Sequence, residues 1–181
     1  MRELALNVLD ITENSVKAGA DKIAIKVAEV GNKMTISIED NGCGMDAEFA
    51  SRVTDPFTTT RTTRKVGLGL PLFKMESEQT GGTFSLRTEK GVGTYVEATF
   101  MTDHIDCMPL GSLGGTMATL LAGNSSIRYV LEYSKDGKSY VFDTDELKEA
   151  LGDFPLDDVE ILSSVEDMID ENINEIKNGG L

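Results

Sequence analysis

The chain has 181 residues, with 17 Lys and Arg against 31 Asp and Glu, a formal net charge of −14 and a sequence pI near 4.4. Such acidity argues against binding nucleic acid, whose phosphates would be repelled, and against binding an anionic membrane surface. No apolar run reaches the roughly eighteen residues that a membrane-spanning helix needs, and the N-terminus lacks a signal-peptide pattern, so we expect a cytoplasmic protein.

The first predicted element is a helix with two stripes, which ends before Ala20. Its apolar stripe is Leu4, Val8, Ile11 and Ser15, and its polar stripe is Asn7, Asp10, Asn14 and Lys17. The polar stripe presents a carboxylate, an amide and an amine in a row. Asp10 could orient an attacking hydroxyl, Asn14 could hold hydrated Mg2+ through its oxygen, and Lys17 could attract a phosphate. An ordinary solvated helix face is the alternative interpretation.

A β-hairpin is predicted next, because apolar residues alternate with polar ones over residues 23–27 and 34–38. Its second strand delivers Asp40 to the sheet edge, where Gly42 and Gly44 interrupt the pattern. A carboxylate there suits an exocyclic amine such as adenine N6, and the glycines let a flat base approach the backbone. An ordinary Asp-Asn-Gly turn is the alternative.

The third motif is a loop that leads into a helix. Residues 56–65 have no periodic apolar face, which predicts a mobile loop, and a helix is expected over residues 71–80. Backbone amides at the helix start, together with nearby cations, would form a phosphate cradle and lid. A soluble loop with no ligand is the alternative. The cradle residues are Arg64, Lys65, Gly67, Leu68, Gly69 and Leu70.

Two further strands are expected over residues 83–86 and 93–101. With the hairpin they give a mixed sheet backed by the two helices, so the predicted fold is α+β, a two-layer α/β sandwich.

Charge divides the chain into two predicted domains. Residues 1–102 carry 12 basic and 14 acidic side chains, net −2, whereas residues 103–181 carry 5 and 17, net −12. The second segment has a predicted hairpin over residues 129–142 and helices over 146–151 and 159–176. We therefore expect a small acidic α+β module of unknown role, whose charge solvates the surface or meets a basic partner.

The motifs together resemble a known superfamily. Residues 10–26 resemble the MutL-type N box and residues 40–45, DNGCGM, resemble a G1 box. GLGLPL at residues 67–72 and the Gly-Val-Gly-Thr of residues 91–94 are similar to the G2 and G3 elements of histidine kinase catalytic domains. The chain is identified as a member of the GHKL superfamily over residues 1 to about 102, which implies a Bergerat-type ATP-binding fold.

The resemblance implies roles for individual residues. Asn14 would coordinate Mg2+ and Asp40 would bind adenine. Thr94 would support Asp40, directly or through water. The G1 motif would place Gly42, Gly44 and Met45 around the base, and residues 67–70 would contact the phosphates.

Two positions of the N box differ between the family's branches. Asp10 aligns with the Glu general base of MutL and gyrase-like ATPases and is one methylene shorter, which changes its reach. Lys17 matches the Asn-x-x-Lys of histidine kinases, whereas MutL has an acid there. The site therefore mixes ATPase-like and kinase-like features.

These features predict a Mg2+-dependent ATP-binding protein, and the favoured function is a signalling kinase that phosphorylates a separate protein on His, Ser or Thr. It resembles the catalytic half of a histidine kinase or a freestanding anti-sigma kinase. His104 follows the last strand of the first segment and is expected to be a linker residue, not a phospho-acceptor. The alternatives are a slow MutL-like ATPase switch and a non-catalytic nucleotide-sensing adaptor, and a homodimer is left open.

Overall fold

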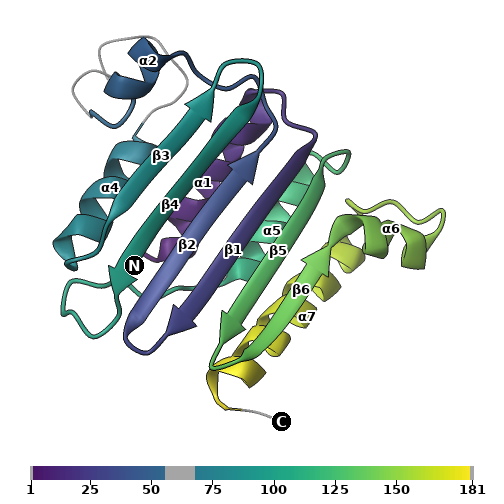
Figure 1. Cartoon of the computed structure of the whole chain (residues 1–181). Helices are drawn as coiled ribbons and strands as arrows, with labels where there is room; N and C mark the ends of the chain where they lie inside the picture. Colours follow the sequence, from purple (N-terminus) through teal and green to yellow (C-terminus); the bar gives the residue numbers. More distant parts are fainter. Residues whose placement is uncertain (1, 56–67, 180–181) are drawn as a thin grey trace.

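A computed structural model describes residues 2–55 and 68–179, and its central feature is one sheet of six strands (Figure 1). The strands are β1 (Lys22–Val30), β2 (Lys33–Asp40), β3 (Phe84–Glu89), β4 (Gly93–Met101), β5 (Arg128–Lys135) and β6 (Lys138–Asp143). Their order across the sheet is β3-β4-β2-β1-β5-β6. Neighbouring strands run antiparallel except β1 and β5, which are parallel.

Four of the described helices cover one face of this sheet, and two short ones lie beside strand ends. The helices are α1 (Leu4–Lys17), α2 (Ala47–Arg52), α4 (Gly69–Gln79), α5 (Leu113–Gly123), α6 (Thr144–Leu151) and α7 (Val159–Lys177). In Figure 1 the layer behind the sheet runs from α4 through α1 and α5 to α7, and each of these helices contacts the next. The predicted two-layer α+β fold is confirmed. No helix within the described ranges is both long enough and apolar enough to cross a bilayer.

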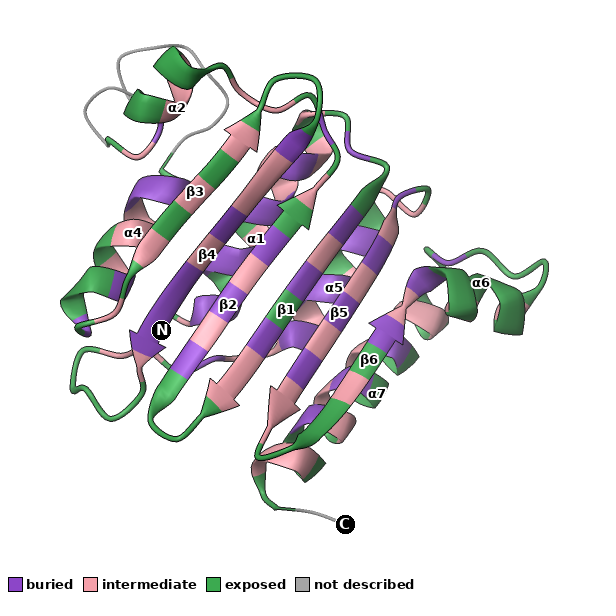
Figure 2. Ribbon diagram, in the orientation of Figure 1, coloured by how far each residue is buried: buried purple, intermediate pink, exposed green. Residues whose placement is uncertain are grey.

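The core lies between the two layers because each strand alternates. In β1 the side chains of Ile23, Ile25 and Val27 are buried against the helices, whereas Lys22 and Lys26 point to solvent. The same alternation is seen in β2 and β5 in Figure 2, whereas the end of β4 is buried continuously. The first predicted hairpin is therefore confirmed, with its inward and outward faces as expected.

Residues 103–181 continue the same sheet. The parallel register sets Ile25 of β1 beside Leu131 of β5, and the buried Tyr129, Leu131 and Tyr133 belong to the same core as β1. The predicted boundary at residue 102 falls just after β4, where the surface charge changes. The charge of a segment reflects mainly its solvent-exposed residues, whereas strand pairing and burial define which residues fold together. In this structure, strand pairing and the shared core join the two segments.

The start of α1 is held by the second segment. No described side chain caps this helix, and the amides of Leu4 and Ala5 donate to the carbonyl oxygens of Pro109 and Leu110, at 2.9 and 2.8 Å. The Thr116 hydroxyl donates to the carbonyl of Ala5 at 3.0 Å. Two of the four amides that every helix N-terminus leaves unpaired are thus satisfied by a distant part of the chain.

Within the second segment, α5 is fixed to α7 by one carboxylate. Asp170 accepts a hydrogen bond from the Ser112 hydroxyl at 2.6 Å and another from the Gly114 amide at 2.9 Å. The helices approach so closely there that a Cβ on Gly114 would collide with the carbonyl of Glu166. The negative charge of Asp170 near the N-terminus of α5 also interacts favourably with the helix dipole.

A buried polar contact joins α1 to α4. The Asn7 amide, placed by the sequence on a polar stripe, is buried and donates to the Glu76 carboxylate, which also lies 3.8 Å from the Arg2 guanidinium. Burial raises the pKa of Glu76, and the hydrogen bond from Asn7 and the charge of Arg2 oppose this effect. Helices α1 and α4, which both carry predicted site residues, are therefore linked through the Glu76 carboxylate, and burial makes the charged form of this carboxylate less favourable.

We expect Asp170→Ala to lower the free energy of unfolding by about 1–3 kcal/mol, because two hydrogen bonds to a charged group are lost. If both segments unfold together, amide hydrogen exchange should accelerate by the same factor in β2 and in β5. Glu171→Ala, an exposed neighbour on α7, is the matched control and should change neither. Acceleration confined to residues 103–181 would instead show two independent domains.

Glu76→Gln should make the protein more stable than the wild type at neutral pH. A raised folded pKa means that the contribution of Glu76 to stability is complete below its ordinary value near 4.5 and is lost as the pH rises through the folded value. The neutral amide avoids that loss and can still accept from Asn7. Denaturant unfolding at pH 4 and pH 8 measures this: the difference should be present at pH 8 and vanish at pH 4, and the reverse order would contradict the assignment. Glu78→Gln, two residues further along α4 and exposed, is the control.

Candidate functional site

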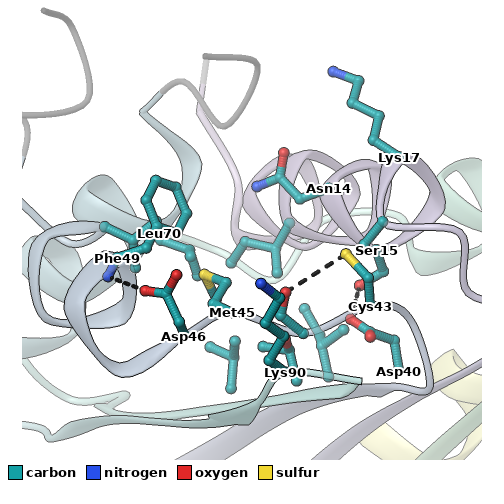
Figure 3. Close-up of a pocket in the computed structure, with 17 residues that line it drawn as sticks. Asn14, Ser15, Lys17, Asp40, Cys43, Met45, Asp46, Phe49, Leu70 and Lys90 are labelled. Carbon is teal, nitrogen blue, oxygen red and sulfur yellow. Dashed lines mark hydrogen bonds between the residues drawn. The ribbon is translucent and has the colours of Figure 1, made fainter. Parts of the chain in front are cut away.

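A cavity of about 480 Å³ lies between α1, the sheet, α2 and the start of α4 (Figure 3). This volume falls in the range of small-molecule sites. Its floor is apolar and includes Ile38 and Val96 from the sheet. The polar and charged side chains that line it are Asn14, Ser15, Lys17, Asp40, Asp46, Lys90 and Thr94.

Asp40 is held in place by two hydrogen bonds. One carboxylate oxygen accepts from the Ser15 hydroxyl at 2.5 Å, and the other accepts from the Gly42 amide at 2.8 Å. The carboxylate is thus oriented between α1 and the end of β2, and each oxygen keeps a further acceptor site. An amino group entering the cavity would find a preorganised acceptor there.

The two predicted glycines have different positions. Gly44 lines the cavity, whereas Gly42 lies behind Asp40. A Cβ on Gly42 would lie 2.9 Å from the Cβ of Ala18, and Gly44 has φ +67° and a Cβ there would collide with the Glu89 carbonyl. The space that a Cβ would need at these glycines is thus taken by backbone and by Ala18, and their contact with a base stays a prediction.

Asn14 carries an unsatisfied polar atom. Its Nδ2 is buried, faces the cavity and has no hydrogen-bond partner among the described residues. A buried amide without a hydrogen-bond partner destabilises the folded protein unless a ligand supplies the hydrogen bond. Rotating the amide would present its oxygen instead, which is the donor type that Mg2+ prefers, usually alongside waters and phosphate oxygens. The residues present therefore fit a Mg2+ ion held through Asn14.

Asp10 and Lys17 flank Asn14 on α1. Lys17 lines the cavity rim, and its extended chain points away from the other labelled side chains in Figure 3. Asp10 is exposed and does not line the cavity; a Cβ on Gly69 would lie 3.4 Å from its Cβ. Asp10 therefore stands beside the start of α4, one turn before Asn14.

The first amides of α4 have no hydrogen-bond partner among the described residues. Leu68 occupies the N-cap position, and no side chain of the described residues caps the helix. The amides of Gly69 and Leu70 point outward from the first turn, which gives this end a partial positive charge. Leu70 lines the cavity, so these amides lie at its edge. The other predicted cradle residues, Arg64, Lys65 and Gly67, lie outside the described residues.

Thr94 lines the cavity beside Asp40, its partner in the β2–β4 register. We expected its hydroxyl to support Asp40 directly or through water. The Thr94 hydroxyl pairs with the Thr88 hydroxyl at 2.9 Å, and Thr88 also accepts from the Met45 amide at 2.9 Å. Among the described side chains Ser15 makes the direct hydrogen bond to Asp40, and support from Thr94 through water stays a prediction.

Sequence reasoning missed several lining residues. Phe49 and Val53 form an apolar wall with Met45 and Leu70, and no periodic pattern marked the short helix α2. Its N-cap Asp46, which accepts from the Phe49 amide at 2.8 Å, was the available signal for a helix start. Lys90 was overlooked in the turn between β3 and β4.

Residues 2–104, more than half of the chain, match the family described as histidine kinase-, DNA gyrase B-, and HSP90-like ATPase. A sensor protein of Shewanella frigidimarina is 30% identical over 101 residues, which are 55% of this chain and 15% of that protein. Sensor protein SrrB of Staphylococcus aureus is 35% identical over 99 residues, which are 52% of this chain and 17% of that protein. The matched region is therefore less than a fifth of either sensor protein.

Among solved structures, the N-terminal domain of a DNA repair protein is similar with a TM-score of 0.51 at 16% identity, and the match covers 78% of this chain and 52% of that chain. This likeness concerns the fold. Its coverage exceeds the share that residues 2–104 make up, so part of the second segment takes part in the shared fold. The resemblance of the sequence motifs is confirmed, and the chain belongs to the family of histidine kinase-, DNA gyrase B- and HSP90-like ATPases.

Proposed function

We propose that the protein binds Mg2+ and ATP in this cavity and transfers the γ-phosphate to a separate protein. The observation that carries the proposal is the fixed carboxylate of Asp40 in an apolar cavity that also contains the unsatisfied amide of Asn14. An adenine amino group would pair with Asp40. The phosphates would then extend along α1 toward Asn14 and the start of α4.

Each end of the cavity would serve one part of the nucleotide. Met45, Phe49 and Leu70 offer an apolar surface for the flat base. The free amides at the start of α4 and the Lys17 ammonium would compensate phosphate charge. Asn14 would hold Mg2+, which when bound neutralises charge that develops on the phosphates.

Asp10 would act on the acceptor. It lies beside Gly69, close to where the γ-phosphate would lie, and its exposure leaves room for an incoming side chain. It would accept a proton from a Ser or Thr hydroxyl, whereas a His acceptor would need this base less. The partner would be a protein, and the net charge of −12 on residues 103–181 favours a basic one. The similarity to sensor proteins supports a signalling role.

The exposure of Asp10 also favours a second candidate, in which water is the acceptor and the protein is a slow ATPase. The two candidates differ only in what approaches Asp10. A nucleotide-sensing adaptor, in which ATP is bound without reaction, remains the third outcome of the experiments below.

The proposal is tested by giving the purified protein γ-labelled ATP, Mg2+ and a cytosolic extract, and then following the label. We expect label on a discrete protein band, and we expect Asn14→Ala to abolish it. Asn174→Ala, an exposed asparagine on α7, is the control and should leave transfer intact. Label found only as free phosphate would favour the ATPase, and label that stays on ATP would favour the adaptor.

Asp10→Asn separates chemistry from binding. Removing a general base typically lowers a rate by about 10²–10⁴-fold, so transfer to Ser or Thr, or hydrolysis, should fall by that factor. The affinity for ATP, measured by calorimetry, should stay within about twofold because Asp10 does not line the cavity. Glu13→Gln on the same helix is the control. Unchanged turnover would remove Asp10 from the mechanism and would point to a His acceptor or to no reaction.

A further inference from the structure

Lys90 is a cation of the cavity that no motif accounts for. We propose that it binds the phosphate chain of the nucleotide from the sheet side, as a second cation opposite α1. This inference rests on the proposed function and adds a residue to it. It assigns to the turn between β3 and β4 a role in recognising phosphate as well as in shaping the cavity.

The side chain of Lys90 is placed for this contact. It lines the same cavity as Asn14 and Asp40, although it comes from the opposite wall. Figure 3 shows its amine directed from the turn into the cavity, toward the side where Asn14 lies, whereas the Lys17 amine points outward. Of the two ammonium groups, Lys90 therefore has the more inward position.

The backbone on both sides of Lys90 is fixed. The Gly91 amide donates to the carbonyl of Cys43 at 2.6 Å, and the Val92 amide donates to the carbonyl of Glu89 at 3.0 Å. The loop at Gly44 packs so closely on Glu89 that no side chain fits between them. The turn is thus fastened to the loop after Asp40, so Lys90 projects from a preorganised position, which lowers the cost of ordering it on binding.

The charge of Lys90 is also available. None of the described carboxylates lies within ion-pairing distance of its amine. The two acids that line the cavity already have partners, because Asp40 accepts from Ser15 and Gly42, and Asp46 caps α2. The Lys90 ammonium thus has no ion-pair partner among the described residues, and such a cation at a mostly apolar cavity suits an anionic ligand.

Lys90 is better placed to bind the phosphates of a nucleotide than to bind its base. Asp40 would fix the amino edge of adenine at one end of the cavity, and the Lys90 amine is directed toward Asn14, which would lie beside the phosphates. An ammonium group is a compact point charge, and a multiply charged phosphate gains more from it than a neutral ring nitrogen does.

The test compares ligands that differ in phosphate. Calorimetry would give the dissociation constants of ATP, ADP and adenosine for the wild type, Lys90→Met, Lys90→Arg and the control Lys33→Met, an exposed residue on β2. We expect Lys90→Met to weaken ATP and ADP about tenfold, which matches one charge-assisted hydrogen bond. Adenosine should change less than twofold, Lys90→Arg should restore most of the affinity, and Lys33→Met should have no effect.

Each other result overturns the inference in a distinct way. If Lys90→Met weakens adenosine as much as ATP, Lys90 contacts the base or ribose. If wild type binds ATP and Lys90→Met binds it equally well, the inference alone is lost and the proposed function stands. If the wild type binds no nucleotide, the proposed function and the inference are lost together. Thermal unfolding of each variant ensures that a lost affinity is not lost folding.

Discussion

The site depends on how α1 is held at its two ends. At its start the amides of Leu4 and Ala5 bond to carbonyls of the chain around residue 110. At its end the Ser15 hydroxyl bonds to Asp40, and the carbonyl of Ala18 accepts from the amide of Cys43. The helix is therefore fixed to the second segment at one end and to the sheet at the other. Asn14 owes its orientation over the cavity to both attachments.

This arrangement makes residues 103–181 part of the support of the site. The contacts of α1 with α5 and of α5 with α7 continue the layer that packs on the sheet, and β5 protects the edge of β1, which would otherwise expose unpaired backbone groups. A change in the Ser112–Asp170 hydrogen bond would alter the position of α5, against which α1 packs. A partner that binds the acidic segment would thus act on elements that are packed against the nucleotide cavity.

The sequence was sufficient for local features and insufficient for contacts between distant residues. The alternation of residues 23–27 and 34–38 predicted the hairpin and the position of Asp40, because period-two patterns report local geometry. Ser15 was assigned to an apolar stripe and Asn7 to a polar one, yet both are buried and bonded to carboxylates 25 and 69 residues away. The charge step at residue 102 likewise concealed a sheet that crosses it. Lys90 could not be identified from the sequence for the same reason, since the pairing of β3 with β4 brings it to the cavity.

The net charge of the whole chain is negative, whereas the cavity has cations at its edge. A net charge of −14 repels an anionic nucleotide at long range, and it attracts a basic protein. In the proposed function, local groups would have to overcome this general field, and the groups available in the described structure are the amides at the start of α4 and the ammonium groups of Lys17 and Lys90. Added salt screens long-range repulsion between the nucleotide and distant charges more than the short-range contacts that these groups would make. Under the proposed function, nucleotide binding and the capture of a basic partner would place opposite demands on the same acidic surface, and the cavity's own cations would allow one chain to meet both.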